Sequence, residues 1–222
     1  MFICKRVLAA AGAALMISTL TNCASETANE SQYSGFLNSY SHFQPVKTES
    51  GHETLRWISP DYQSDKYTSV YFSPVVYYPR PRPDSRVSAS TLELVRLYTE
   101  RQLKNAESTR HKLSDRPQPG GLIIKTAITA VTAENENVQF YEVVPVAAVL
   151  AGTMAVTGHR SQDAELFLEA EAIDVSTNQP VVKVIRKGYG KTVSNSSAPI
   201  TVEDVKSAID DMVKDVMTFP VH

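Results

Sequence analysis

The most reactive side chains of this chain are its two cysteines, Cys4 and Cys23. A thiol can form a disulfide, ligate a metal, act as a nucleophile or carry a lipid. Cys4 lies inside an apolar amino-terminal stretch, and Cys23 lies just after its end. If the chain is cut before Cys23, that residue becomes the only thiol, so an internal disulfide and a thiolate metal site are excluded. The position of Cys23 at the end of an apolar leader makes acylation of a new amino terminus the role that we expect for it.

The first 22 residues have the layout of a secretory signal peptide. Lys5 and Arg6 are followed by the uncharged segment Val7–Ile17 and then by small and polar residues. The apolar run is much shorter than the roughly 20 residues that a membrane-spanning helix needs. A buried amino-terminal helix is the alternative, and basic residues before an apolar run favour export.

The segment Leu20–Cys23 resembles the lipobox of bacterial lipoproteins, in which leucine lies three residues before an acylated cysteine. Asn22 departs from the usual small residue, and ordinary signal-peptide cleavage after Ser25 is the alternative. The resemblance implies attachment of palmitate and other acyl chains to Cys23, which would be the only lipid attachment site. Ala24 implies sorting to the outer membrane, with the domain facing the periplasm, because aspartate at this position favours inner-membrane retention.

Composition predicts one exported globular domain. Cleavage before Cys23 removes 22 of 222 residues and leaves 200, enough for a single hydrophobic core. The formal charge then changes from −2 to −4, because the leader has two basic residues and no acid. A mildly acidic chain argues against nucleic-acid binding. We expect a flexible, small and polar tether at residues 23–33 and a globular domain at residues 34–222.

No pattern predicts a catalytic, metal or cofactor site. Gly188–Thr192 ends like a phosphate-binding loop, but Ile185 occupies the place of the first glycine and no helix is expected to follow. Glycines in a turn at a strand end are the simpler interpretation. None of the five histidines has metal-ligand spacing. Three acids of one alternating segment are expected on the solvent face of a strand rather than in a catalytic pair: Glu165, Glu169 and Glu171.

One unusual segment, Tyr77–Pro83 (YYPRPRP), predicts a stiff extended backbone. It is either a rigid connection from a strand to a helix or a contact site for an anionic envelope component or partner protein, since arginine and tyrosine are enriched at interfaces. The predicted partner-contact residues are Trp57, Tyr77, Tyr78, Arg80 and Arg82. An alternative function is an enzyme or small-ligand carrier with an aromatic cleft lined by Trp57, Tyr77 and Tyr78.

The remaining patterns predict a mixed α/β domain with elements in the order β-α-β-α-β-β-α. Strands are expected at 53–58, 67–78 (interrupted at Pro74), 122–132, 164–175 and 181–186. Helices are expected at 91–108, after a capping box starting at Ser90, at 145–157, and from Thr201 onward. The apolar stripe of the last helix steps by three and four residues: Val202, Val205, Ile209, Met212 and Val216.

Several short motifs resemble a family of Gram-negative lipoproteins that is catalogued only as a domain of unknown function. They are Ser34-Gly35-Phe36-Leu37 with Tyr40, Leu55-Arg56-Trp57 with Pro60 and Tyr67, Ser73-Pro74-Val75, and Glu169-Ala170-Glu171 with Asp174 and Thr177. The resemblance implies an envelope lipoprotein and supplies no catalytic residues. We therefore expect a non-enzymatic, partner-binding periplasmic domain anchored by Cys23; a wall-contact protein is a further alternative.

Overall fold

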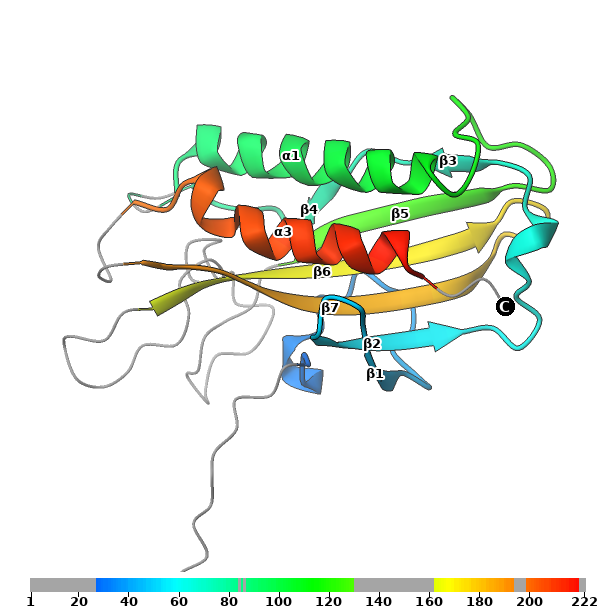
Figure 1. The fold of residues 1–222 in the computed structure, drawn as a ribbon, viewed down its shortest axis with the longest axis horizontal. Helices are drawn as coiled ribbons and strands as arrows, with labels where there is room; N and C mark the ends of the chain where they lie inside the picture. The colour runs from blue at the N-terminus through cyan, green and yellow to red at the C-terminus, as the bar shows by residue number, and fades with distance from the viewer. Residues whose placement is uncertain (1–26, 84, 86, 130–161, 194–198, 220–222) are drawn as a thin grey trace, which may run out of the picture.

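The computed structural model describes residues 27–83, 85, 87–129, 162–193 and 199–219. Within them the chain forms a seven-stranded sheet with two long helices side by side on one face (Figure 1). The strands are β1 (Gln44–Lys47), β2 (Glu53–Ile58), β3 (Val70–Phe72), β4 (Val76–Tyr78), β5 (Leu122–Thr129), β6 (Gln162–Asp174) and β7 (Gln179–Val193). The helices are α1 (Ala89–Ser108) and α3 (Val202–Met217), with 3-10 turns η1 (Glu30–Gln32) and η2 (Ser64–Lys66).

The sheet is mixed. Its strand order is β1-β2-β7-β6-β5-β3, and β4 also pairs with β5. Neighbours from β1 to β5 are antiparallel, whereas β3 and β4 run parallel to β5. This arrangement confirms the predicted mixed α/β domain.

Most predicted strands are present, with two differences. The strand expected at Tyr67–Tyr78 is split, since Ser73–Val75 separates β3 from β4 and Pro74 has no N–H to donate to a ladder. Strand β1 was not predicted, because it is short, mostly exposed and contains Pro45, so it has no apolar alternation. The predicted helix at residues 145–157 lies outside the described residues.

Both helices begin at capped residues. The cap of α1 is Ser88, whose Oγ accepts a hydrogen bond from the Thr91 N–H at 3.0 Å; the predicted cap at Ser90 was therefore wrong by two residues. Helix α3 begins after Thr201, as predicted. The Thr201 N–H donates to Asp204 Oδ2 at 2.8 Å, which satisfies a donor at the helix start.

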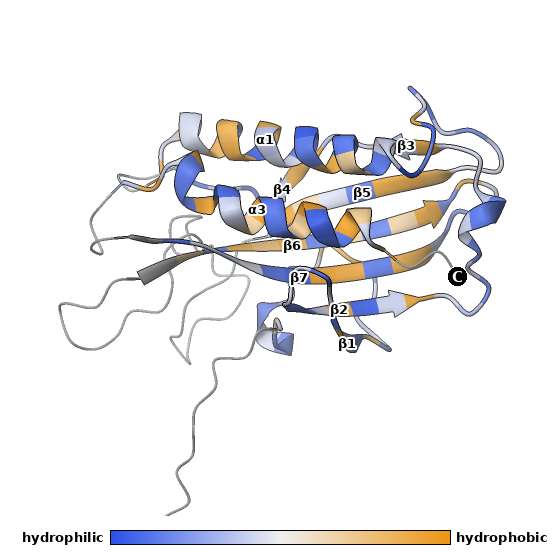
Figure 2. Cartoon of the chain, in the orientation of Figure 1, coloured by the Kyte–Doolittle hydropathy of each residue, from blue (hydrophilic) through white to orange (hydrophobic). Residues whose placement is uncertain are grey.

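The main core lies between the two helices and the sheet. Figure 2 shows apolar residues concentrated along β5, β6 and β7, beneath α1 and α3. Two glycines of β7 let α3 approach closely. A Cβ atom at Gly188 would lie 2.6 Å from Met212 Cε, and one at Gly190 would overlap the carbonyl oxygen of Asp204. These glycines therefore lie within a strand under a helix, not in the expected turn.

The opposite face of the sheet is covered by the amino-terminal segment, residues 28–43. Its aromatic side chains pack around Leu55, Phe167 and Ile185. The expectation that Glu165, Glu169 and Glu171 form a solvent face was wrong, because Glu169 is 0% exposed and Glu171 is also buried. The predicted tether also differs: Ala28 is only 4% exposed, so chain packing begins before residue 33.

Candidate functional site

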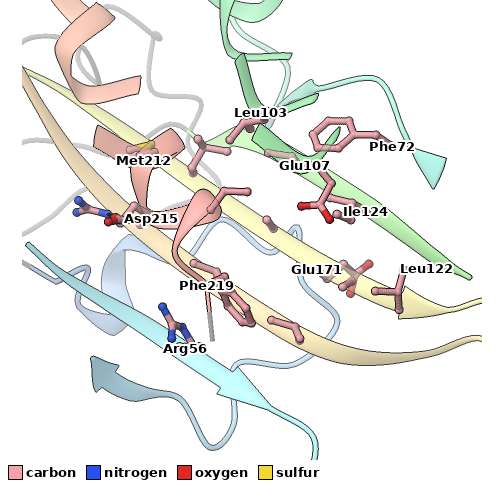
Figure 3. A pocket seen from close by; sticks show the side chains of 18 of the residues that line it. Arg56, Phe72, Leu103, Glu107, Leu122, Ile124, Glu171, Met212, Asp215 and Phe219 are labelled. Carbon is pink, nitrogen blue, oxygen red and sulfur yellow. Dashed lines mark hydrogen bonds and ion pairs between the residues drawn. The ribbon is translucent and has the colours of Figure 1, made fainter. Parts of the chain in front are cut away.

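A cavity of about 160 Å³ lies between the helix-covered face of the sheet and the carboxyl-terminal halves of α1 and α3. Its floor includes Ala170 and Ala172 of β6, which remain half-buried because no side chain fills the space above them. Leu103 of α1 and Met212 of α3 contribute to its roof (Figure 3). The interior is therefore mainly aliphatic.

Most charged groups that line the cavity already have partners. Glu107 Oε1 lies 2.5 Å from His111 Nδ1. Arg186 Nε donates to Asp215 Oδ2 at 2.9 Å in a pair whose side chains are 4% and 11% exposed. Arg110 donates to the Val216 carbonyl oxygen at 2.5 Å. Glu171 also contributes to the lining, but its carboxylate pairs with Lys125 at 3.8 Å.

Arg56 of β2 is the exception among the described residues. It is 9% exposed, its buried Nε has no hydrogen-bond partner, and it forms no ion pair. Its guanidinium carbon lies 4.5 Å from the ring centroid of Phe219, and the guanidinium carbon of Arg110 lies 5.7 Å from the same centroid. Figure 3 shows the Arg56 side chain extending from β2 beside Phe219. The cavity thus has an aliphatic interior and one largely buried cation that forms no ion pair with a described residue.

Burial changes the acid–base properties of this region. Desolvation lowers the pKa of Arg56, and the nearby Asp215 carboxylate partly offsets that effect. Burial also raises the pKa of Tyr62, although the charge of Arg110 acts in the opposite direction. Within the described ranges, no group of three or more His, Cys, Asp or Glu side chains is arranged to hold a metal ion. The cavity is therefore suited to bind a group that has both an apolar and an anionic part.

The structure does not bring the predicted aromatic residues into one cleft. Trp57 faces the side covered by the amino-terminal segment and lies under Lys183 Nζ, 5.1 Å from its ring centroid. Tyr77 faces the helices and donates to the Leu92 carbonyl oxygen at 2.9 Å. Tyr78 packs beside Phe36 on the other side. Three strands (β7, β6 and β5) separate β2, which carries Trp57, from β4, which carries both tyrosines, so Trp57 is far from them.

The other predicted residues fall into two groups. Arg80 and Arg82 are exposed and follow β4. Cys23 lies outside the described residues. The sequence named Arg56 only as part of the Leu55-Arg56-Trp57 motif and did not indicate Arg110 or Phe219; these three residues lie at the charged end of the cavity.

The family model described as "Protein of unknown function (DUF3313)" matches residues 32–216, and the chain belongs to this family. This confirms the family resemblance inferred from the short motifs. In the part of the chain that the structure describes, neither helix has both the length and the apolar character needed to cross a bilayer.

Two relatives match this chain over most of their own length. The chain is 43% identical over 203 residues to the "Uncharacterized lipoprotein YdcL" of Escherichia coli strain K12, covering 91% of each chain, and equally similar to the same protein of E. coli O157:H7. Among solved structures, a PelC dodecamer from Paraburkholderia phytofirmans has 11% identity and a TM-score of 0.36, covering 75% of this chain and 98% of that chain. A putative neuraminyllactose-binding hemagglutinin homolog from Helicobacter pylori has 7% identity and a TM-score of 0.34, covering 70% and 80%.

Proposed function

We propose that this protein is an envelope lipoprotein anchored to the outer membrane by acyl groups on Cys23, with its domain in the periplasm. The observation that carries the proposal is 43% identity, over 91% of both chains, to a protein named a lipoprotein. The apolar leader that ends just before Cys23 supplies the matching attachment point. Several acyl chains on one residue give stable anchoring, whereas a single chain binds a membrane only marginally.

The start of the packed chain limits how far the domain could lie from its anchor. Ala28 is buried, and the five residues from Cys23 to Ala28 span at most about 18 Å when fully extended. An acylated Cys23 would therefore hold the face covered by residues 28–43 close to the bilayer. The two helices cover the opposite face of the sheet and would point away from the membrane.

Metabolic labelling with a clickable palmitate analogue tests the anchor. We expect label on the natural chain and on Cys4→Ala, whose substitution lies in the leader, but none on Cys23→Ala. Membrane fractionation should then release Cys23→Ala from the outer-membrane fraction. Label that persists in Cys23→Ala, or mature protein beginning after Ser25, would contradict the proposal.

The role that we propose for the domain is non-enzymatic binding of an envelope partner that presents acidic groups. The support is an exposed surface at the β4 end of the sheet, formed by Val76, Tyr78, Arg80 and Arg82, which we call the β4 surface. Val76 and Tyr78 are each 42% exposed, and both arginines are exposed. Exposed aromatic, aliphatic and arginine side chains in one place are typical of protein interfaces.

Photo-crosslinking in cells tests this role. A photoreactive amino acid at Val76 or Arg82 should give one discrete crosslinked protein, and the same probe at Lys47, on the opposite sheet edge, should not. Charge reversal at Arg80 and Arg82 should reduce the product. Crosslinks only to abundant porins, or equal crosslinking from Lys47, would argue against a specific partner. Co-sedimentation with peptidoglycan would instead favour the wall-contact alternative.

A further inference from the structure

We propose that the cavity between the helices and the sheet binds a small amphiphilic monocarboxylate, with its apolar body on the Ala170–Ala172 floor and its carboxylate on the guanidinium of Arg56. This site is separate from the β4 surface. It is also not the aromatic cleft expected from the sequence, because Trp57, Tyr77 and Tyr78 are absent from its lining.

The anionic part of the ligand is inferred from Arg56. Burial of a guanidinium is costly unless its N–H donors are hydrogen-bonded, and because arginine stays charged in proteins, such a group is normally paired with an acid. Arg56 is more than nine-tenths buried and lines the cavity, yet its Nε has no partner among the described residues. Contact with Phe219 orients the group without using its N–H donors. A carboxylate in the cavity would accept these donors in the forked geometry that arginine favours.

The number of charges around the cavity indicates a monoanion. Arg56, Arg110 and Arg186 contribute three positive charges, and Glu107 and Asp215 contribute two negative charges. Glu171 is not counted because its carboxylate pairs with Lys125. These five side chains together contribute one positive charge. A phosphate dianion would add a second negative charge beside the carboxylates of Glu107 and Asp215, so a carboxylate matches the site better.

The size and lining of the cavity define the apolar part. Its volume of about 160 Å³ is close to that of a dry engineered cavity of about 150 Å³ that binds benzene. The residues around it include Leu103, Ile124 and Met212, which offer no hydrogen bonds to water. An apolar group about as large as a benzene ring would therefore fill the space. The phenyl ring of benzoate and the alkyl chain of hexanoate are groups of about this size.

Isothermal titration calorimetry on the mature chain carrying Cys23→Ala tests the proposal without detergent. We expect one benzoate per chain, and similar binding of hexanoate. Benzyl alcohol has the ring without the charge, and acetate has the charge without the ring, so each should bind at least tenfold more weakly. No benzoate binding at millimolar concentration, or binding of benzyl alcohol as tight as that of benzoate, would overturn the proposal.

Variants locate the binding. Arg56→Met keeps an apolar stem and should weaken benzoate at least tenfold while leaving benzyl alcohol unchanged. Ala170→Leu should fill the floor and weaken both compounds. The matched control is Arg101→Met, an exposed arginine of α1 outside the cavity, which should bind benzoate like the parent. If Arg56→Met does not fold, Arg56→Lys keeps the charge without the fork and should show an intermediate loss. Benzoate should also shift the NMR signal of the Met212 methyl group. An unchanged Met212 signal, or Arg56 variants that bind benzoate as tightly as the parent, would contradict binding in this cavity.

Discussion

The hydroxyl of Tyr40 donates a 2.6 Å hydrogen bond to Oε2 of Glu169, and this bond joins the amino-terminal segment to a central strand of the sheet. The other carboxylate oxygen accepts the Ser34 N–H at 2.7 Å. The Tyr40 oxygen also accepts the N–H groups of Gly35 at 2.7 Å and Leu37 at 3.3 Å. Gly35 has φ of +82°, a conformation that favours glycine. Two sequence motifs of the family therefore meet in one hydrogen-bonded cluster, which gives them a structural role.

Tyr40→Phe should destabilise the domain by about 1–3 kcal/mol, because it removes a donor from a carboxylate that is shielded from water. Urea unfolding followed by circular dichroism measures the change. Tyr71→Phe is the matched control. The Tyr71 hydroxyl has no hydrogen bond to another described residue, so its loss should change the unfolding free energy by less than about 0.5 kcal/mol. Equal effects of the two substitutions would show that the Tyr40–Glu169 bond does not stabilise the fold.

The same hydrogen bond predicts a loss of stability at alkaline pH. Burial, and then the hydrogen bond to Glu169, raise the pKa of Tyr40 to about 12 from an ordinary value of 10. The folded state therefore favours the neutral phenol. Its contribution is complete below pH 10 and is lost as pH rises from 10 to about 12.

Tyrosinate absorbance should show a late-titrating component that decreases by one tyrosine in Tyr40→Phe and does not vanish, because burial also raises the pKa of Tyr67 and of Tyr77. The urea midpoint of the natural chain should also fall across this pH range by more than that of the variant. Identical pH profiles for the two proteins would contradict the expected role of Tyr40.

The strand pattern of Ala164–Val175 predicts β6 but not the surroundings of its two faces. The alternation correctly separates the alanines and leucines from the glutamates. It cannot show that residues 28–43 cross the glutamate face, because that segment has no regular period and its path depends on long-range contacts with Phe167 and Ile185. A buried carboxylate that accepts two hydrogen bonds has the same sequence pattern as an exposed one.

The sequence pattern could not predict the candidate site for a related reason. Arg56 lies between Leu55 and Trp57 in β2, an alternation typical of a strand with one wet face. Only the fold shows that Phe219, just after the end of α3, places its ring over the arginine. The cavity itself depends on the distance between the helices and the sheet. Local patterns therefore predict β2 and α3, whereas the cavity depends on how they pack.

Close packing of α3 on β7 predicts that Gly190→Ala will be costly. The added Cβ would overlap the backbone carbonyl of Asp204, and the helix would have to move; such overpacking typically costs about 1–3 kcal/mol. Gly188→Ala is the comparison, because its Cβ would first meet the flexible end of Met212. Thermal unfolding should therefore show a larger decrease for Gly190→Ala than for Gly188→Ala. The reverse order would mean that α3 yields more easily than Met212.

The proposed anchor makes a sorting prediction at Ala24. By resemblance to lipoproteins in which aspartate at this position favours inner-membrane retention, Ala24→Asp should move the acylated protein from the outer-membrane to the inner-membrane fraction. Ala24→Ser is the matched control and should not change the distribution. Density-gradient separation of the two membranes measures this. Outer-membrane recovery of Ala24→Asp, with acyl label retained, would contradict the sorting rule while leaving the anchor intact.

The buried pair of Arg186 and Asp215 links β7 to the end of α3 and should be sensitive to loss of one partner. Arg186 also donates to the carbonyl oxygen of Lys187, and at 3.0 Å to Ser50 Oγ. Asp215→Asn leaves a buried guanidinium without its counter-charge, which typically costs about 3–5 kcal/mol. Asp211→Asn is the matched control on the same helix. Asp211 is 27% exposed and pairs with Lys214, so its substitution should cost at most about 1 kcal/mol.

Chemical unfolding of both variants, with the double variant Arg186→Met/Asp215→Leu, separates pairing from simple loss of charge. Replacement of both partners by apolar groups removes the uncompensated charge, so we expect the double variant to be more stable than Asp215→Asn. A double variant as unstable as Asp215→Asn, or equal costs for Asp215→Asn and Asp211→Asn, would show that the Arg186–Asp215 pair does not control the docking of α3 on β7.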